Sequence, residues 1–471
     1  MAKVFITGAT GQVGSHLAYY IAKEKPFGVK DGSDIFCLVR NPSPKRTYFL
    51  KKYGINIVEG TLLDKETINQ TLLDEQIDYV FHAAANPNPA ASFEDIYPPN
   101  VIGTRNVLEA FNASRGRSFV FCSSIAVYGA FMSEDQVTVV DETSPLGSLT
   151  ENEPYPVTKI KSENMIQNAA ADNPDKQYII TRIGVIIGPR DTMVLPTFVQ
   201  LLSMPFIPKL IANGRDYIAI TSPLDVARGQ VFLAKKGPKI SGEVFNIAGE
   251  HVTYRQVYKY ISKYFRWLPP QISVPMWSFN MFKPIFPYLK DLFPDNDFVQ
   301  KALSPSAIEF IGKSFIYKTD KLENLGFEFM VSAEETITAA LKYSYPSGRL
   351  REPFVVRSWK ENVLNLIEIL DDSIEDIREK VKYNCLNGID CENTERYESQ
   401  LEKARADLRK ALELEEKAQQ LVDKAKEEKK EVTERAKLKL RKARMIEREA
   451  KATKEAAEKA LEQCYEENMS S

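Results

Sequence analysis

The sequence predicts an α/β fold, in which a doubly wound parallel sheet is followed by a smaller C-terminal subdomain and then by a long helical tail. Short apolar runs alternate with helical patterns up to about residue 345, which is typical of a parallel sheet with helices on both faces. The composition then changes, because no proline follows Pro353 and no glycine follows Gly388. We therefore expect a folded domain over 1–345, a helical connector over 346–395 and a long helix or coiled coil over 396–467.

The folded domain is expected to divide again near residue 180. Six apolar runs have the length of buried strands, at 4–7, 34–39, 56–59, 79–84, 118–122 and 179–183. Helical patterns fall between them, among others at 14–23, 101–113 and 157–171. Ligands of such sheets bind outside the carboxyl ends of the strands. We expect the site there, with a cofactor held by residues 1–180 and a substrate by residues 181–345.

Length, charge and cysteine content narrow the class of protein. The 471 residues are 44% hydrophobic with a net charge of −2, so a large core is expected and a nucleic-acid partner is not. Cys37 and Cys122 lie in apolar runs, as reduced core thiols do, and the spacing of Cys385 and Cys391 is wide for a zinc knuckle. No apolar run is long enough to span a membrane, and a strand begins at once. We expect a cytoplasmic protein without a metal site, a spanning helix or a signal peptide.

The segment 265–294 differs from the rest of the domain. It holds two of the three tryptophans, and its prolines interrupt any single long helix. One interpretation is a small subdomain that packs its aromatic side chains on the sheet domain. The other is an apolar lid over an apolar substrate, or a surface that makes peripheral contact with a membrane.

A seven-residue repeat runs from Leu401 to Cys464. Four of its nineteen core positions are not apolar, and alanine dominates the others. The repeat predicts a long helix, either as a weakly associating coiled coil or helical hairpin or as a largely solvated charged helix. Its charges nearly balance, so we do not expect the tail to bind nucleic acid. We expect a homo-oligomer, with a tail that self-associates or docks a partner.

Two short patterns carry the chemistry. Gly8, Gly11 and Gly14 follow the first apolar run and precede a helix, where glycines let the backbone approach a pyrophosphate at the positive end of the helix. Such turns also occur for packing alone. Tyr155 and Lys159 are four residues apart, so they share one face of a helix. Because a neighbouring cation lowers the pKa of a phenol, this pair is a candidate for acid-base catalysis.

The second predicted strand ends at Arg40, where a site for NAD usually carries an acidic residue for a ribose hydroxyl. An arginine suits the 2′-phosphate of NADP instead, and Lys45 and Arg46 follow closely. The alternative is that all three are solvated surface cations.

Five motifs together carry a family resemblance. They are Thr-Gly-Ala-Thr-Gly-Gln-Val-Gly at 7–14, His-Ala-Ala-Ala at 82–85, Asn-Val-Ile-Gly-Thr-Arg-Asn-Val-Leu-Glu-Ala at 100–110, Ser-Ser-Ile-Ala-Val-Tyr-Gly at 123–129 and Tyr-Pro-Val-Thr-Lys at 155–159. On these motifs, residues 2–345 resemble an extended short-chain dehydrogenase/reductase, the superfamily of NAD-dependent epimerases and dehydratases that includes dihydroflavonol reductases and 3β-hydroxysteroid dehydrogenases. The resemblance implies a Rossmann-type fold with a nicotinamide dinucleotide, and a late strand at 245–249.

The resemblance also implies roles for individual residues. Ser124 corresponds to the catalytic hydroxyl, Tyr155 to the acid-base and Lys159 to its partner, which also binds the nicotinamide ribose. The implied cofactor contacts come from the ends of the first four strands and from the glycine turn, namely Gly8, Gly11, Gln12, Val13, Gly14, Arg40, Thr61, Leu62, Ala83, Ala84 and Ala85. Thr61 departs from the aspartate that the family commonly has at the adenine.

Three further positions bear on the reaction. Ile125 and Ala126 stand where nucleotide-sugar dehydratases have an acidic pair, and Val185 stands where sugar epimerases commonly have asparagine. With Arg40 and the segment 265–294, they favour an NADP(H)-dependent oxidoreductase that transfers hydride to or from a carbinol or ketone carbon of an apolar small molecule. The alternatives are a nucleotide-sugar epimerase or reductase with tightly bound NAD, and a nucleotide-binding scaffold that acts through its helical tail.

Overall fold

The computed structural model describes residues 2–88, 91–129, 137–147, 154–203, 210–292, 299–300, 303, 308 and 311–346. Contacts within the chain divide it into two units, Met1–Pro353 and Phe354–Ser471, and every described residue belongs to the first. The connector and the coiled coil predicted beyond residue 346 lie outside the described residues.

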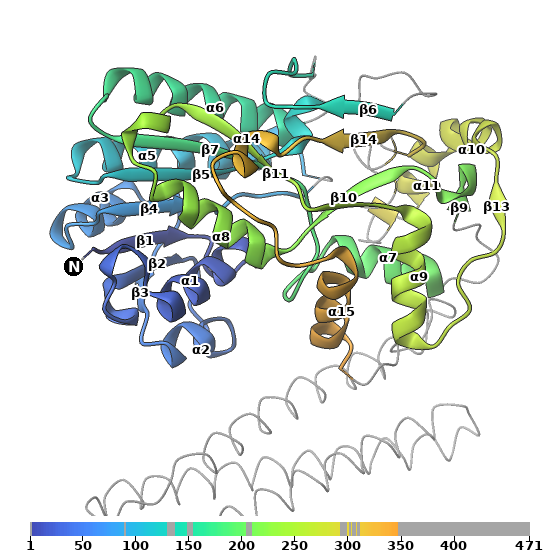
Figure 1. Cartoon of the computed structure of the whole chain (residues 1–471), viewed down its shortest axis with the longest axis horizontal. Coiled ribbons are helices and arrows are strands. Elements are labelled where there is room, and N and C mark those ends of the chain that lie inside the picture. Colours follow the sequence, from blue (N-terminus) through green and yellow to red (C-terminus); the bar gives the residue numbers. More distant parts are fainter. Residues whose placement is uncertain are drawn as a thin grey trace, which may run out of the picture. The chain divides into compact units, whose positions relative to one another are not determined.

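The centre of the first unit is a parallel sheet of seven strands in the order β11-β7-β5-β4-β1-β2-β3 (Figure 1). Its strands are β1 Val4–Thr7, β2 Ile35–Val39, β3 Asn56–Glu59, β4 Tyr79–His82, β5 Ser118–Ser124, β7 Gln177–Ile183 and β11 Glu243–Ile247. The chain runs outward from β1 to β3 and then returns to place β4 beside β1. The sheet is the doubly wound, Rossmann-type fold that the sequence predicts, and β1 and β4 flank its reversal point, where ligands of this fold bind.

All six strands expected from the apolar runs are present, and the late strand is β11. β4 ends at His82 rather than at residue 84, because Ala84 turns to donate its N–H to Thr7 Oγ1 at 3.1 Å. β5 continues beyond its expected end to Ser124, because it pairs with β7 along its whole length. The strand ends therefore depend on contacts with neighbouring segments.

Helices cover both faces of the sheet. One face is covered by α1 (Gln12–Glu24), α2 (Pro44–Lys52) and α8 (Pro223–Ala234), and the other by α3 (Lys65–Asp74), α5 (Gly103–Ala113) and α6 (Pro154–Asp172). Ile6 belongs to the first of the two cores and its neighbour Phe5 to the second, as the alternation of side chains along a strand requires. The helices expected at 14–23, 101–113 and 157–171 are confirmed as α1, α5 and α6.

Local sequence signals fix where several helices begin. Ser222 accepts a hydrogen bond from the first turn of α8, and Pro223 occupies the first position of that helix. Thr253 and Gln256 form a reciprocal capping box at the start of α9 (Tyr254–Phe265). These side chains satisfy N–H groups that have no partner within the helix.

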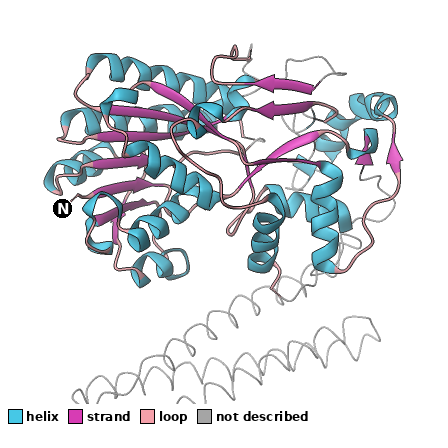
Figure 2. Cartoon of the chain, viewed as in Figure 1, coloured by secondary structure: helices cyan, strands magenta, loops and turns pink. Residues whose placement is uncertain are grey.

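The remainder of the described chain forms smaller sheets beside the central one (Figure 2). A three-stranded sheet has the order β12-β10-β8, and two further pairs are β13-β9 and β14-β6. The strands are β6 Val137–Val140, β8 Val185–Ile186, β9 Leu210–Ile211, β10 Tyr217–Thr221, β12 Glu250–Thr253, β13 Ser273–Val274 and β14 Ser314–Tyr317. The other helices are α4 Phe93–Tyr97, α7 Val194–Ser203, α10 Met276–Phe282, α11 Phe286–Leu292, α14 Asp320–Glu323 and α15 Ala333–Ser344. α7, α9 and α15 enclose a third apolar core.

The pairing of β6 with β14 joins two distant parts of the chain. The two strands are parallel, with Val137 opposite Ser314 and Val140 opposite Tyr317. β6 lies in the segment that connects β5 to α6. The last strand of the described chain therefore holds the connection between the two elements on which Ser124 and Tyr155 lie.

Candidate active site

Three glycines shape the turn between β1 and α1. Gly8 has a φ of +73°, which favours glycine, and a Cβ on Gly14 would lie 2.3 Å from the carbonyl oxygen of Gly8. α1 begins at Gln12 with Gly11 as its cap, and this cap has no side chain to bond the first turn. The backbone N–H groups at the start of α1, among them those of Gln12 and Val13, are suited to bind an anion.

Ala83, Ala84 and Ala85 follow β4 and reach the same turn. A Cβ on Gly8 would lie 2.8 Å from the backbone nitrogen of Ala84, so the two segments touch backbone to backbone. The small side chains leave room for a ligand over this junction. The turn and the alanines fit a dinucleotide whose pyrophosphate lies at the start of α1.

The side chain of His82 holds the end of β4 against β1 and α5, which was not predicted from the sequence. Its Nδ1 lies 2.7 Å from Thr7 Oγ1, and its Nε2 lies 2.9 Å from Thr104 Oγ1. Burial lowers the pKa of His82 to about 3, with a smaller effect from the charge of Lys159. The ring is therefore neutral near pH 7, and it acts as a fixed hydrogen-bonding link between β1, β4 and α5.

Arg40 lies directly after β2, at the carboxyl edge of the sheet, and its side chain is exposed. Arg46 is also exposed in the first turn of α2, and Ser43 caps that helix by accepting from the N–H of Arg46 at 3.4 Å. No acidic residue occurs between Arg40 and Arg46. The side chain of Lys45 lies outside what the structure describes. Two cationic side chains and a helix N-terminus are thus available near the end of β2.

Thr61 and Leu62 follow β3, and both are held by local contacts. Thr61 Oγ1 accepts from the N–H of Leu63 at 3.2 Å, and the carbonyl oxygen of Leu62 accepts from Asn106 Nδ2 at 2.9 Å. Asp64 accepts from the N–H of Thr67 at 3.2 Å and is the cap of α3. The Asp64 carboxylate, which follows the expected adenine contact in the sequence, is therefore engaged in starting a helix.

Ser124, Tyr155 and Lys159 come together where β5 meets α6. Lys159 is 3% exposed, and its Nζ donates to the carbonyl oxygen of Cys122 at 2.6 Å. The same ammonium lies 4.6 Å from the centre of the Phe121 ring and 5.7 Å from the centre of the Tyr155 ring. The predicted shared helix face is confirmed, since Tyr155 and Lys159 are one turn apart on α6.

Burial controls the protonation of the phenol. Burial raises the pKa of Tyr155 far above its ordinary value, and a hydrogen bond with the Ser124 side chain opposes this effect only in part. The expected lowering of the Tyr155 pKa is not found, because removal of the phenol from water outweighs the other influences. Burial also lowers the pKa of Lys159 itself, against opposing effects of Cys122 and Glu163.

A buried ionic network, which the sequence argument missed, anchors α6 to the sheet. Glu163 Oε1 accepts from Ser123 Oγ at 2.5 Å, and Glu163 Oε2 accepts from Arg182 Nη2 at 2.8 Å. The Arg182 guanidinium lies 4.8 Å from the centre of the Tyr128 ring, and Tyr128 in turn donates to Asn246 Oδ1 at 2.7 Å. Tyr155, Lys159 and Glu163 follow one another at intervals of four residues, so their spacing could have indicated that Glu163 lies on the same side of α6 as the other two.

Asn100 is a second residue that the sequence argument did not single out. It lies in a π-helical turn, Pro98–Ile102, and its Nδ2 donates to Thr158 Oγ1 at 3.1 Å. Its Oδ1 accepts from the N–H of Asn86 at 2.7 Å. Turns of this kind are frequent at functional sites, and this one connects α6 to the chain that follows Ala85.

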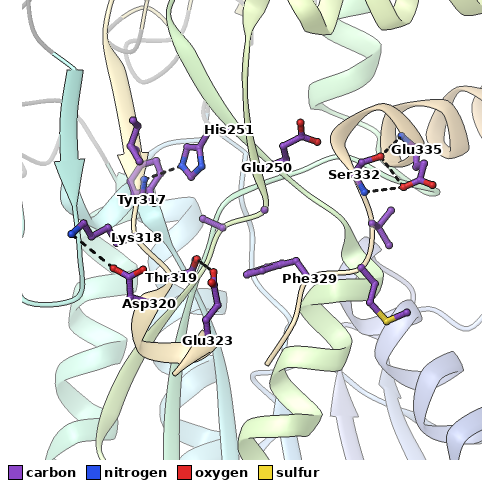
Figure 3. A pocket seen from close by; sticks show the side chains of 15 residues that line it. Glu250, His251, Tyr317, Lys318, Thr319, Asp320, Glu323, Phe329, Ser332 and Glu335 are labelled. Atoms are coloured by element: carbon purple, nitrogen blue, oxygen red, sulfur yellow. Dashed lines mark hydrogen bonds and ion pairs between the residues drawn. The ribbon is translucent and has the colours of Figure 1, made fainter. Parts of the chain in front are cut away.

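A separate surface pocket of about 600 Å³ lies beside the last strands (Figure 3). None of the three candidate catalytic residues lines it. Its carboxylates are used locally, since Glu250 accepts from the N–H of Ala333 at 2.8 Å and Glu335 accepts from Ser332 Oγ at 2.7 Å. The pocket therefore lies where α15 meets the β11–β12 turn, away from the candidate catalytic residues.

The two core cysteines are reduced, as expected, with Cys37 buried and Cys122 partly exposed. Within the described residues, no group of histidine, cysteine and carboxylate side chains is arranged to hold a metal ion. Cys385 and Cys391 lie outside the described residues.

The fold and the placement of Ser124, Tyr155 and Lys159 beside a glycine turn define the class, an extended short-chain dehydrogenase/reductase. Residues 4–248 match the model of the NAD dependent epimerase/dehydratase family. The chain belongs to this family, and it is an enzyme.

Known relatives within this family differ in reaction. The chain is 28% identical to a dTDP-D-glucose 4,6-dehydratase of Dictyostelium discoideum over 260 residues. This alignment covers 52% of this chain and 58% of that protein. The chain is 21% identical to the decarboxylating sterol-4-alpha-carboxylate 3-dehydrogenase of Bos taurus over 350 residues. That alignment covers 72% of this chain and 91% of the dehydrogenase. The solved UDP-glucuronic acid 4-epimerase of Bacillus cereus, in complex with NAD, has a TM-score of 0.54 at 20% identity and covers 75% and 100%. The structural likeness extends to the fold, and the relatives span dehydratases, epimerases and dehydrogenases.

Proposed function

We propose that the chain is an NADP(H)-dependent oxidoreductase that interconverts a carbinol and a ketone on an apolar small molecule. The observation that carries the proposal is the hydrogen bond between the Tyr155 and Ser124 side chains, at the carboxyl end of β5 and at the same edge of the sheet as the glycine turn. A phenol and a hydroxyl at one point are the donors that a carbonyl oxygen needs as it gains negative charge.

The Tyr155 phenol can serve as the proton donor in reduction of a ketone. A phenol that keeps its proton at neutral pH is ready to donate it to the substrate oxygen, as a general acid. Ser124 Oγ accepts from the N–H of Ala126 at 3.2 Å, and its hydroxyl, which bonds the Tyr155 side chain, is the group that can turn to donate to the same substrate oxygen. A bound nicotinamide supplies the hydride in this direction. The buried ammonium of Lys159 holds α6 against β5 through its hydrogen bond to the carbonyl oxygen of Cys122.

The residues around Ser124 support an apolar substrate. Ile125 is 8% exposed and Ala126 follows it, so neither offers the acid-base groups of a dehydratase. Val185 is partly exposed in β8 and gives a sugar nothing to bond. The relative whose match covers 91% of its length is a sterol dehydrogenase by name. These observations together favour a hydrophobic alcohol or ketone.

A nucleotide-sugar epimerase with tightly bound NAD is the second candidate. It is favoured by the match to the epimerase/dehydratase family and by the relatives that act on nucleotide sugars by name. The two candidates differ in one observable, because an epimerase regenerates its cofactor at each turnover and an oxidoreductase consumes NADPH.

Arg40 gives the cofactor preference a direct test. We expect the purified enzyme to bind NADPH more tightly than NADH, and Arg40→Asp to remove about ten-fold or more of that preference, because one charge-assisted contact to a phosphate is lost. Lys235→Asp, which changes a cation outside the cofactor cradle, is the matched control. Equal affinity for both cofactors, together with conversion of a UDP-sugar by enzyme with bound NAD, would establish the epimerase instead.

A further inference from the structure

The segment that follows α9 presents an unusual surface. Between Arg266 and Lys283 the sequence contains no charged residue, although 27% of the whole chain is charged. More than half of the surface of six large apolar side chains here is exposed to solvent, namely Leu268, Ile272, Trp277, Met281, Tyr288 and Leu292. Elsewhere among the described residues, the large apolar side chains that are more than half exposed are those of Val139, Met330 and Tyr343, which lie apart in the sequence. We call this surface the 268–292 face.

The local structure turns these side chains outward. Trp277 and Met281 are one turn apart on α10, and Tyr288 and Leu292 are one turn apart on α11, so each pair occupies one side of its helix. The opposite sides meet each other, since the rings of Phe279 and Phe286 lie 5.5 Å apart. Both helices are therefore apolar on two sides, and the outer side lacks a partner within the described chain.

The face lies on the right of the described chain in Figure 1, on the side away from the N-terminus and β3. No helix among the described residues is both long and apolar enough to cross a bilayer. We propose that the 268–292 face rests on the surface of a lipid bilayer that contains anionic lipids, with α10 and α11 lying in the plane of the head groups. This inference goes beyond the proposed reaction and does not depend on it.

Composition and charge identify the lipid surface as the occupant. Tryptophan and tyrosine with flanking cations are the residues that favour the boundary between head groups and acyl chains. Arg266, Lys283 and Lys290 outnumber the single acid of the segment, Asp291, although the whole chain is slightly acidic. Anionic head groups neutralise these cations. A second copy bound through a two-fold axis would instead set the same cations against one another.

Vesicle flotation with the full chain tests the proposal. We expect the protein to float with vesicles of phosphatidylcholine and phosphatidylserine. The double variant Trp277→Glu with Met281→Glu should bind at least about ten-fold more weakly, since it loses two apolar side chains that would be buried in the bilayer. Leu73→Glu with Met330→Glu is the control, because both residues are exposed elsewhere on the molecule. The control should float like the unchanged protein, and all variants should unfold at similar temperatures.

Two further measurements separate the lipid surface from other occupants. Lys283→Glu with Lys290→Glu should weaken binding to anionic vesicles and leave binding to pure phosphatidylcholine nearly unchanged. With Trp267→Phe and Trp359→Phe, Trp277 becomes the only tryptophan, and its emission should shift to shorter wavelength on anionic vesicles. Equal flotation of Trp277→Glu with Met281→Glu and the unchanged protein would overturn the proposal. So would sedimentation showing an oligomer that this variant dissociates, with no vesicle binding by either protein.

Discussion

Glu163 and Arg182 form an ion pair inside the protein, with Oε2 and Nη2 2.8 Å apart and both side chains at most 5% exposed. Glu163 lies on α6, one turn beyond Lys159, and Arg182 lies on β7. The pair therefore ties the helix that carries the candidate acid-base to the strand beside Ser124.

Removal of one charge from this pair should destabilise the fold strongly. Glu163→Gln leaves the buried guanidinium without its counter-charge, for which we expect a loss of about 3 kcal/mol in the free energy of unfolding. Glu109→Gln is the matched control, because its partner Lys65 lies at 2.6 Å in an exposed pair that contributes about 0–1 kcal/mol. Urea unfolding of both variants gives the comparison, and equal losses would contradict a special role for the buried pair.

Tyr155→Phe should abolish most of the activity and spare the fold. Removal of the general acid lowers kcat by about 10²–10⁴-fold, whereas cofactor affinity, measured by quenching of protein fluorescence, should change little. Tyr128→Phe removes another buried phenol, whose hydroxyl donates to Asn246 at 2.7 Å. It should cost stability rather than the chemical step. If both variants kept full turnover, Tyr155 would not be the proton donor.

The two directions of the reaction should depend on pH with opposite signs. Burial raises the pKa of Tyr155 above the ordinary value of about 10, so the phenol stays protonated through neutral and mildly alkaline solution. Ketone reduction needs this protonated form, and its kcat should stay level until the pH approaches the raised pKa and then fall. Alcohol oxidation needs the phenolate, and its kcat should rise with pH over the same range. Steady-state rates followed by NADPH absorbance give both profiles. If the rate of reduction began to fall as the pH was raised while still under about 8, Tyr155 would not be a proton donor with a raised pKa.

Gly14→Ala should disrupt the cofactor cradle. The added Cβ would lie 2.3 Å from the carbonyl oxygen of Gly8, and backbone cannot yield as a side chain does. We expect a loss of about 1–3 kcal/mol in stability and a weaker affinity for NADPH. Gly229→Ala is the control within α8, because its Cβ would meet side chains rather than backbone, with the tip of Ile247 at 3.1 Å and the Phe327 ring at 3.5 Å. Isothermal calorimetry with NADPH should separate the two variants.

The strands and the pairing of Tyr155 with Lys159 could be predicted because their signals are local. A parallel strand buried on both faces is a continuous apolar run, and Tyr155 and Lys159 need only the period of a helix to be brought together. The position of Arg40 at the end of a strand could likewise be predicted, because the apolar run that forms β2 ends at Val39. The protonation of Tyr155 could not be predicted in this way, because its pKa depends on how many neighbours exclude water from the phenol.

The pairing of β6 with β14 was missed for a related reason. Val137 and Val139 are exposed and Thr138 and Val140 buried, so β6 is a short alternating strand with no sign of its partner. The Glu163–Arg182 pair was missed because each residue, taken alone, has the character of a surface charge. Both are long-range contacts, and the sequence pattern of one segment does not encode them.

The β6–β14 pairing has a consequence for how the enzyme is made. A nascent chain that has just passed β11 already contains every candidate catalytic and cofactor residue, and it can complete the seven-stranded sheet. The partner of β6 has not yet been synthesised at that moment, so the link from Ser124 to Tyr155 is still unrestrained. Domains fold as their segments emerge from the ribosome, and distant contacts form last. The restraint on this link therefore comes from the last part of the domain to be synthesised, whose residues also complete the core over the sheet, among them Leu322 and Phe327.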